Sequence, residues 1–327
     1  MNVAALLLVA GLLLLIKGGD WFVTAAVRLA EFLRMPHVVI GSTLVSLATT
    51  TPELAVSIMA GLRGEAGLAV GNAVGSVICN LGLIVGLTAV LRHVDLHWKT
   101  LRRALFAMIG LGLLLLLLTW DLRLSRLSGA ALVALGLGYF AWDFLDHYRN
   151  RTPAAVREAV AIQAEAVGDR PFLATPAGAL LQFLGGAGVV VLGSRLLVEG
   201  AVTLAHGLGV PPLVVGLTVV AVGTSLPELI TAITSSRRNV SDLSLGNVLG
   251  ANIANLSLIV GAAALLQDIT LDRVTQVFHL AAMLGFMGLV ALFVRTGSRV
   301  TRTEGAILLG SYAIYLGAVL AWMLAAR

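Results

Sequence analysis

Charged residues are scarce in this sequence. Asp, Glu, Lys and Arg make up 12% of its 327 residues, whereas 58% are hydrophobic. A soluble domain of this size needs more polar surface, so the composition excludes a soluble globular protein and indicates a membrane-embedded one. The apolar run from Val3 to Ile16 lacks the basic segment and the cleavage site of a signal peptide. We therefore expect it to remain as a transmembrane helix.

Cysteine is nearly absent, and acidic residues are fewer than basic ones. The single cysteine, Cys79, excludes an intrachain disulfide, and its apolar surroundings indicate a packing role. The net charge of +5 does not predict a nucleic-acid partner, because the basic residues lie in loops between apolar segments. A bias of basic loops toward one membrane face explains them better.

Ten segments are apolar and long enough to cross the hydrocarbon core of a bilayer, which takes about 20 residues of helix. They cover residues 3–27, 38–62, 66–91, 102–119, 128–147, 174–204, 212–235, 243–266, 275–294 and 304–325. The first and sixth also carry charges, at Lys17, Asp20, Arg195 and Glu199. The sequence predicts an all-α polytopic membrane protein with ten transmembrane helices, in contact with lipid.

The distribution of Lys and Arg predicts the orientation. With ten spans, the loops that follow odd-numbered helices share one side and carry 15 basic residues, against 5 on the other side. The richer side is cytoplasmic, so an inner-membrane protein with both termini on the non-cytoplasmic side is expected. In the cytoplasmic connection 149–173, apolar residues at helical spacing after Pro153 predict a short amphipathic helix.

An internal repeat divides the chain. Residues 41–86 align with 216–261 without a gap, at an offset of 175. The identities include Gly41/Gly216, Thr43/Thr218, Thr49/Thr224, Pro52/Pro227, Glu53/Glu228, Gly71/Gly246, Asn72/Asn247, Gly75/Gly250 and Asn80/Asn255. The repeat predicts two five-helix halves, 1–148 and 174–327. Because five is odd, the halves must have opposite topology, which is typical of secondary transporters with a site between the halves.

Glu53 and Glu228 are the candidate centre of that site. A carboxylate inside an apolar span is costly, and its presence at two equivalent positions favours a bound cation over a structural hydrogen bond. Each follows a proline, which removes a helical hydrogen bond. We expect this to free main-chain carbonyls around Ser46 and Ala221.

The other polar groups near these glutamates are oxygen donors. They are Thr49, Thr50, Thr224, Ser225, Ser76, Asn80 and Asn255. No His or Cys cluster accompanies them, which argues against zinc and copper, whereas hard oxygen ligands suit calcium, manganese and sodium. No resident cofactor is expected. Asn72 and Asn247 are expected to bond to neighbouring helices, and Gly71, Gly75, Gly246 and Gly250 to allow close helix packing.

The motifs TTTPE with GNAVGSVICN, and GTSLPE with GNVLGANIAN, resemble the two alpha repeats of the sodium/calcium exchanger family, in the cation/calcium antiporter superfamily. The resemblance implies antiport at a central calcium position flanked by sodium positions, and first and sixth helices that slide as gates. It implies that Glu53 and Glu228 bind calcium, with carbonyl help near Thr50 and Thr224. The residues implied to complete the cage are Ser225, Thr49, Ser46, Ala221, Ser76, Asn80 and Asn255.

Two departures from the family pattern leave the driving ion open. Sodium-coupled members usually have an acid at one of the positions held here by Asn80 and Asn255, and a serine where this chain has Ala251. A sodium-driven calcium antiporter is the leading interpretation, and a proton-driven calcium or manganese antiporter the alternative. A cation channel is disfavoured because channels usually build their pore from several subunits, whereas one chain here supplies both halves and is expected to function as a monomer. No enzyme motif such as HExxH is present.

We predict that Glu53→Gln and Glu228→Gln each abolish calcium transport and leave the protein folded. Each substitution removes one of the two negative side-chain charges at the centre and preserves side-chain volume. Calcium uptake into proteoliposomes by the purified variants measures the effect, and normal uptake by either variant would refute the assignment.

Overall fold

The chain is helical apart from four two-residue strands in the part that the structure describes. The computed structural model describes residues 2–32, 50–91, 94–95, 98–149, 175–226, 228–229, 232, 241–297 and 299–325. Its elements are α1 (Asn2–Phe32), α4 (Thr51–Leu62), α5 (Ala66–Cys79), η2 (Asn80–Val85), α6 (Gly86–Leu91), β1 (Val94–Asp95), α7 (Trp98–Leu118), β2 (Arg123–Leu124), α8 (Arg126–Arg149), α10 (Pro176–Leu208), α11 (Pro212–Val215), η4 (Gly216–Val220), α12 (Ala221–Thr224), α14 (Ser241–Ala254), η5 (Asn255–Ile259), α15 (Val260–Leu266), β3 (Ile269–Thr270), η6 (Thr275–His279), α16 (Leu280–Thr296), β4 (Arg299–Val300) and α17 (Arg302–Ala325). The elements marked η are π-helical.

Eight of the described helices are long and apolar enough to cross a membrane, which confirms a polytopic helical membrane protein. The shorter apolar helices Thr51–Leu62 and Pro212–Thr224 belong to the spans expected over 38–62 and 212–235. Those two spans lie partly outside the described residues, so the count of ten remains a prediction. The amphipathic helix expected within 149–173 also lies outside them, apart from Arg149 at the end of α8.

The first and sixth spans are longer than their apolar runs predicted. Helix α1 extends to Phe32 and α10 to Leu208. In α10 the ends are set locally: Thr175 Oγ1 accepts a hydrogen bond from the N–H of Gly178, and Gly209 ends the helix in the left-handed conformation, at φ 66°. Hydropathy marks only the part of a helix that is apolar, whereas capping residues set its true ends.

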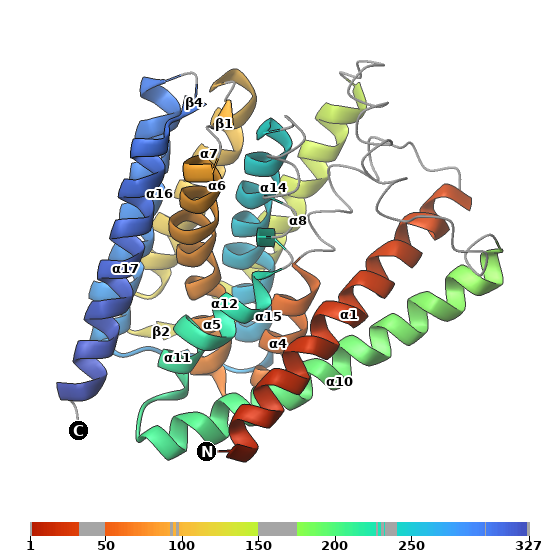
Figure 1. Ribbon diagram of the computed structural model, residues 1–327, viewed down its shortest axis with the longest axis horizontal. Helices are drawn as coiled ribbons and strands as arrows, with labels where there is room; N and C mark the ends of the chain where they lie inside the picture. The colour runs from red at the N-terminus through yellow and green to blue at the C-terminus, as the bar shows by residue number, and fades with distance from the viewer. Residues whose placement is uncertain are drawn as a thin grey trace.

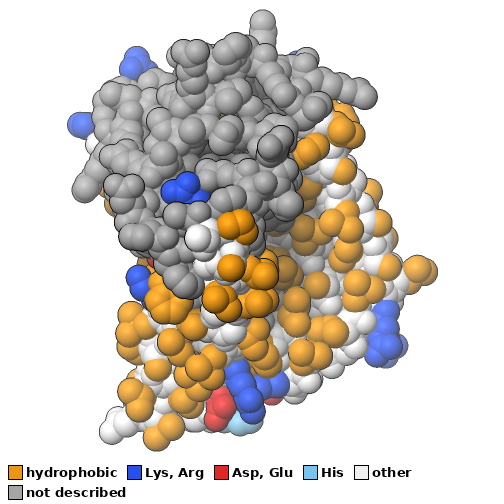
Figure 2. All heavy atoms as spheres, turned by 90° about the vertical axis from the view of Figure 1, so that its right-hand side faces the viewer, with side chains coloured by type: hydrophobic (Ala, Val, Ile, Leu, Met, Phe, Trp, Pro, Cys, Tyr) orange, Lys and Arg blue, Asp and Glu red, His pale blue; other side chains and the backbone are white. Residues whose placement is uncertain are grey.

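Two helices form the centre of the bundle. They are the continuous segments 66–91 and 241–266, each interrupted by a π-helical stretch, and 78% of the residues in the most apolar 18-residue stretch of each span, Ala66–Leu91 and Leu245–Leu266, are buried. In the other six candidate spans this share is between 22% and 44%. The outer helices expose apolar residues instead, and Figure 2 shows hydrophobic side chains over much of the described face. This is the expected exterior of a protein whose solvent is lipid.

Two small sheets cap the bundle at opposite ends (Figure 1). Strand β1 pairs antiparallel with β4, with Val94 opposite Val300, and β2 pairs antiparallel with β3, with Leu124 opposite Ile269. Each sheet therefore joins a segment from the first half of the chain to one from the second. Both termini lie toward the same end of the molecule (Figure 1).

Helices α1 and α10 lie side by side and antiparallel, along one flank of the bundle (Figure 1). Small residues line their contact every seven positions on both helices. On α1 they are Ala4, Gly11, Gly18 and Ala25, and on α10 they are Ala179, Gly186, Gly193 and Gly200. A Cβ added at Gly193 would lie 2.8 Å from the Leu15 nitrogen, and one added at Gly11 would lie 2.8 Å from the Gly193 oxygen. The backbones touch directly, as small residues permit in membrane helices.

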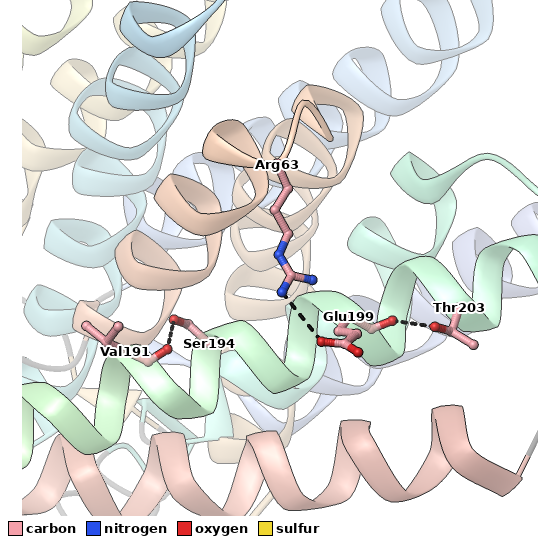
Figure 3. Close-up of polar contacts among 5 residues, drawn as sticks. All are labelled: Arg63, Val191, Ser194, Glu199 and Thr203. Carbon is pink, nitrogen blue, oxygen red and sulfur yellow. Dashed lines mark hydrogen bonds and ion pairs between the residues drawn. The ribbon is translucent and has the colours of Figure 1, made fainter.

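Three of the charges that the sequence places in these two helices, at Lys17, Asp20 and Glu199, have charged partners. Lys17 lies 3.9 Å from Asp20 on α1, and its Nζ lies 5.8 Å from the centre of the Trp21 ring. Arg63, just past the end of α4, reaches Glu199 on α10 at 3.5 Å (Figure 3). The hydroxyls of Ser194 and Thr203 donate to carbonyls of α10 itself, at 2.9 and 2.7 Å (Figure 3). Pairing explains how α1 and α10 carry charge and remain helices in an apolar setting.

Close packing was also expected at the glycines of the repeat. A Cβ added at Gly75 would lie 2.7 Å from the Leu217 Cα on η4, and Gly71 likewise contacts the backbone of Leu213. Gly246 has no such contact: a Cβ there would meet nothing within 4 Å among the described residues. The packing role is confirmed for Gly71 and Gly75, and no described contact supports it for Gly246.

We predict that Gly193→Ala lowers the melting temperature of the purified protein, whereas Gly188→Ala leaves it unchanged or raises it. Both glycines lie in α10, so both substitutions gain about 1 kcal/mol of helix propensity. Only at Gly193 does the new methyl group meet the backbone of α1, and overpacking of this kind costs about 1–3 kcal/mol. Equal melting temperatures in detergent would contradict the packing of α1 against α10.

Candidate cation site

Glu53 and Glu228 are both completely buried, with an exposure of 0%. Glu53 lies in the first turn of α4, where the unpaired N–H groups of a helix favour a negative charge. Ser225, three residues before Glu228, donates a hydrogen bond to the Glu53 carboxyl group, so the two glutamates lie on neighbouring segments. The structure thus brings together, inside the bundle, the two glutamates that the repeat singled out.

The backbone is irregular just before each glutamate. Thr50 precedes α4 with φ −82° and ψ 1°, and Ser225 follows α12 with φ −82° and ψ 6°. The two residues are 175 positions apart, so the same local break recurs at equivalent positions. Their dihedrals lie in the sparsely populated bridge region, where many active-site residues are found. Pro52 acts as a helix start at the beginning of α4, which is a favourable position for proline.

Glu53 uses only one of its carboxyl oxygens within the described protein. Ser225 Oγ donates to Glu53 Oε1 at 3.3 Å, a hydrogen bond between residues 172 positions apart. Glu53 Oε2 has no hydrogen-bond partner among the described residues. A buried carboxylate oxygen without a donor is energetically costly, so a cation is the ligand that this atom best fits.

Two amides and a hydroxyl present further oxygens of this kind. Asn80 and Asn255 each begin a π-helical segment, at equivalent positions of the two central helices. Such π segments within α-helices are frequent at functional sites. Both side chains are buried, as is Ser76, one turn before Asn80. Asn80 Oδ1, Asn255 Oδ1 and Ser76 Oγ have no hydrogen-bond partner in the described part of the chain.

The amide nitrogens of these two asparagines do have partners. Asn255 Nδ2 donates to the Ala251 carbonyl at 3.0 Å, and Asn80 Nδ2 donates to Asn252 Oδ1 at 2.9 Å. With the nitrogens engaged, each amide offers its oxygen alone. Helices α4 and α5 and the segment η5, which carry Glu53, Ser76 and Asn255, pack against one another.

Asn72 has a structural role, as expected from its sequence context. Its Nδ2 donates to the Glu53 carbonyl at 3.2 Å and to Ser57 Oγ at 3.1 Å, and its Oδ1 accepts from Thr224 Oγ1 at 3.1 Å. These bonds join α5 to α4 and α12. Asn72 therefore holds the helix of Glu53 in place and has no oxygen without a partner.

One expectation about the main chain is wrong. The Ala221 carbonyl is not freed by Pro227, because it accepts from the Ser225 N–H at 3.1 Å and from Thr224 Oγ1 at 3.3 Å. The physical reason is spacing: the N–H that Pro227 lacks would have bonded four residues earlier, to Gly223. Ser46 and Thr49 lie outside the described residues, whereas Thr50 and Thr224 are described and buried.

Sequence reasoning missed three neighbours of the site. They are Ser57, Asn252 and Met108, all completely buried. Asn252 did leave a signal, because the repeat aligns this polar residue with Val77. The described residues hold no group of three or more His, Cys, Asp or Glu side chains that could bind a metal ion. The oxygen-rich, weakly charged arrangement is typical of sites for calcium or sodium and differs from those for zinc.

The family model for the sodium/calcium exchanger protein matches residues 3–144 and 178–321. The chain belongs to the sodium/calcium exchanger family. It is 33% identical over 330 residues to the inner membrane protein YrbG of Escherichia coli K12, covering 99% of this chain and 98% of YrbG. It is 30% identical over 338 residues to the sodium/calcium exchanger MaX1 of Methanosarcina acetivorans, covering 95% of this chain and 97% of MaX1.

Solved structures agree with the family assignment. The sodium-calcium exchanger NCX_Mj, in a crystal soaked with zero Na⁺ and Ca²⁺, matches with a TM-score of 0.64 and 28% identity. The match covers 97% of this chain and 99% of that one. The family consists of transporters, and the chain shares both its sequence and its fold.

Proposed function

We propose that this protein is a secondary antiporter that exchanges calcium for sodium across the membrane by alternating access. The observation that carries the proposal is the set of buried oxygens without hydrogen-bond partners among the described residues, in a core that also buries two glutamates. Two carboxylates neutralise one divalent cation, and all the donors are hard oxygen ligands. The relatives MaX1 and NCX_Mj are both named as sodium/calcium exchangers.

The proposed cage consists of carboxylate, amide, hydroxyl and main-chain oxygens. Its members are Glu53, Glu228, Thr49, Thr50, Thr224, Ser225, Ser76, Asn80, Asn255, Ser46 and Ala221. The first two neutralise calcium, and the amide oxygens of Asn80 and Asn255 serve the flanking sodium positions. Ala221 is included through its carbonyl oxygen, which accepts from the Ser225 N–H and Thr224 Oγ1 in this structure and would have to exchange a hydrogen bond for the ion. The ions are cargo, and no resident cofactor is proposed.

The halves 1–148 and 174–327, joined by 149–173, are proposed to be inverted repeats with ten spans in all. Support comes from features that recur 175 residues apart: the turns at Thr50 and Ser225, and the π segments that begin at Asn80 and Asn255. The strands β1 and β3 also begin 175 residues apart, and their sheets lie at opposite ends of the bundle (Figure 1). Opposite placement of equivalent elements is what inversion requires.

We place the protein in the inner membrane, with both termini on the non-cytoplasmic side, and propose that a monomer is functional. The E. coli relative is named an inner membrane protein, and the basic loops support this orientation. Because one chain supplies both glutamates, the site is complete without a second subunit. Lipid and the transported cations are the partners, and no nucleic acid is involved.

A proton-driven calcium or manganese antiporter is the second candidate. The specific observation in its favour is that neither Asn80 nor Asn255 is acidic and that Ala251 offers no hydroxyl. The side chains at the flanking positions therefore offer less negative charge to a monovalent cation than the equivalent side chains of sodium-coupled relatives. Protons and metal cations compete for the same two carboxylates, so exchange with protons is chemically open to this site.

Flux measurements decide between these candidates. Purified protein is reconstituted into liposomes, and calcium uptake is followed under an outward sodium gradient or an outward proton gradient. We expect the sodium gradient alone to drive uptake. Uptake driven by the proton gradient alone would mean that protons, and not sodium, drive the exchange. Downhill calcium flux that needs neither counter-ion would indicate a channel. Glu53→Gln is the inactive control.

We predict that Asn255→Asp raises the apparent affinity for sodium, more strongly at pH 9 than at pH 7. The new carboxylate adds negative charge at a flanking position, but it also faces the Ala251 carbonyl, to which Asn255 now donates. Two oxygens in contact favour a shared proton, so the effect emerges as pH rises. Sodium-driven calcium flux against sodium concentration measures it, with Asn80→Asp as the equivalent change in the other half. Curves that match wild type at both pH values would remove Asn255 from the sodium positions.

A further inference from the structure

Asn252 lies in the last turn of α14, just before η5, and its side chain is completely buried. It belongs to none of the positions that the repeat motifs assign to the cage, and its repeat equivalent is the apolar Val77. Its Oδ1 accepts from Asn80 Nδ2 at 2.9 Å, and its own Nδ2 donates to Met108 Sδ at 3.5 Å. A polar chain thus runs from α7 through α14 to the Asn80 amide.

We propose that Asn252 is a positioning residue, which orients the Asn80 amide so that Asn80 Oδ1 is available to a bound cation. The proposal rests on the proposed function of the central site and adds a residue to it. Asn252 does not itself coordinate the ion, because both ends of its amide have protein partners.

The direction of the chain follows from hydrogen-bonding chemistry. A thioether sulfur accepts hydrogen bonds and cannot donate them, so the amide nitrogen of Asn252 must face Met108. Asn252 Oδ1 then faces Asn80, and an oxygen there can be paired only with the Asn80 nitrogen. The reverse orientation of Asn80 would set two amide oxygens against each other and turn N–H groups toward the cation. Met108 therefore determines, through Asn252, which end of Asn80 is free.

The two halves orient their equivalent amides in different ways. Asn255 is held by the Ala251 carbonyl of its own central helix, four residues earlier. Asn80 is held by a side chain 172 residues away, in the other half. Asn80 therefore offers its oxygen only while α14 is packed beside η2, and these two elements are in contact. Loss of the hydrogen bond between Asn80 and Asn252 should weaken cation binding, although both carboxylates stay in the site.

A double-mutant cycle tests the proposal. Binding of calcium, and separately of sodium, to purified protein is measured for wild type, Asn252→Leu, Asn80→Ala and the double variant. Asn252→Leu removes the acceptor at similar volume, and we expect about a tenfold loss of calcium affinity. In the Asn80→Ala background, which has no amide to orient, the same substitution should have no further effect. An equal loss in both backgrounds would mean that Asn252 acts only through packing, and would overturn the proposal.

Asn252→Asp supplies the conservative rescue. A protonated carboxyl group at 252 can donate to Met108 Sδ and still accept from Asn80 Nδ2, so calcium affinity should stay within about twofold of wild type. If Asn252 acts through packing alone, the order of calcium affinities should be reversed, because Leu would be tolerated and the buried Asp would disrupt the core. That order would refute the positioning role. If Asn252→Leu does not fold, Met108→Leu replaces it in the cycle, with a smaller loss that must again vanish without the Asn80 amide.

The cycle also separates this proposal from the proposed function. Calcium binding by wild type with no coupling between positions 80 and 252 removes the positioning role and leaves the exchanger function in place. If wild type binds neither calcium nor sodium, both proposals fail together.

Discussion

The constraint on which the structure depends is the burial of two carboxylates inside a bundle of membrane-spanning helices. Glu53 and Glu228 have no exposure to solvent. Charges in such a place persist only if a cation or a proton compensates them. The surroundings are organised to let that partner come and go: the neighbouring groups offer oxygens but no basic side chain is among the bonds described for the site. A fixed Lys or Arg would have made the pair permanent, whereas an exchangeable cation makes transport possible.

Close helix packing builds the walls around these carboxylates. Glycines allow α5 to approach η4, and α1 to lie against α10, with backbone in contact with backbone. The α1–α10 pair contacts the rest of the described protein mainly through α4, α11, η4 and α12. Helix α4 carries Glu53, and α12 carries Thr224. A displacement of the pair as one body would therefore act directly on the elements that hold the site.

Neutral amides take the positions where a third acid would be expected in sodium-coupled relatives. An amide has one end that attracts cations and one that repels them, so its use as a ligand requires that its orientation be set. Asn255 is oriented by its own backbone and Asn80 by a side chain from the other half. Asn72, with donors and acceptor all engaged, holds the helices together instead. Three buried asparagines of the same repeat motifs thus have different tasks, which only their hydrogen-bond partners distinguish.

Sequence alone determined the membrane class, most helix positions, the two intramembrane glutamates and the oxygen-donor chemistry, because hydropathy, proline positions and residue type are local properties. Family membership also followed from local motifs. The tertiary structure decided the rest. It showed that Ala221 keeps its hydrogen bonds, that Gly193 packs against α1, and that Asn252 holds Asn80. Each of these depends on which atoms of distant segments meet, and a lone pair is free or engaged only according to a partner as far as 172 residues away. No local pattern contains that information.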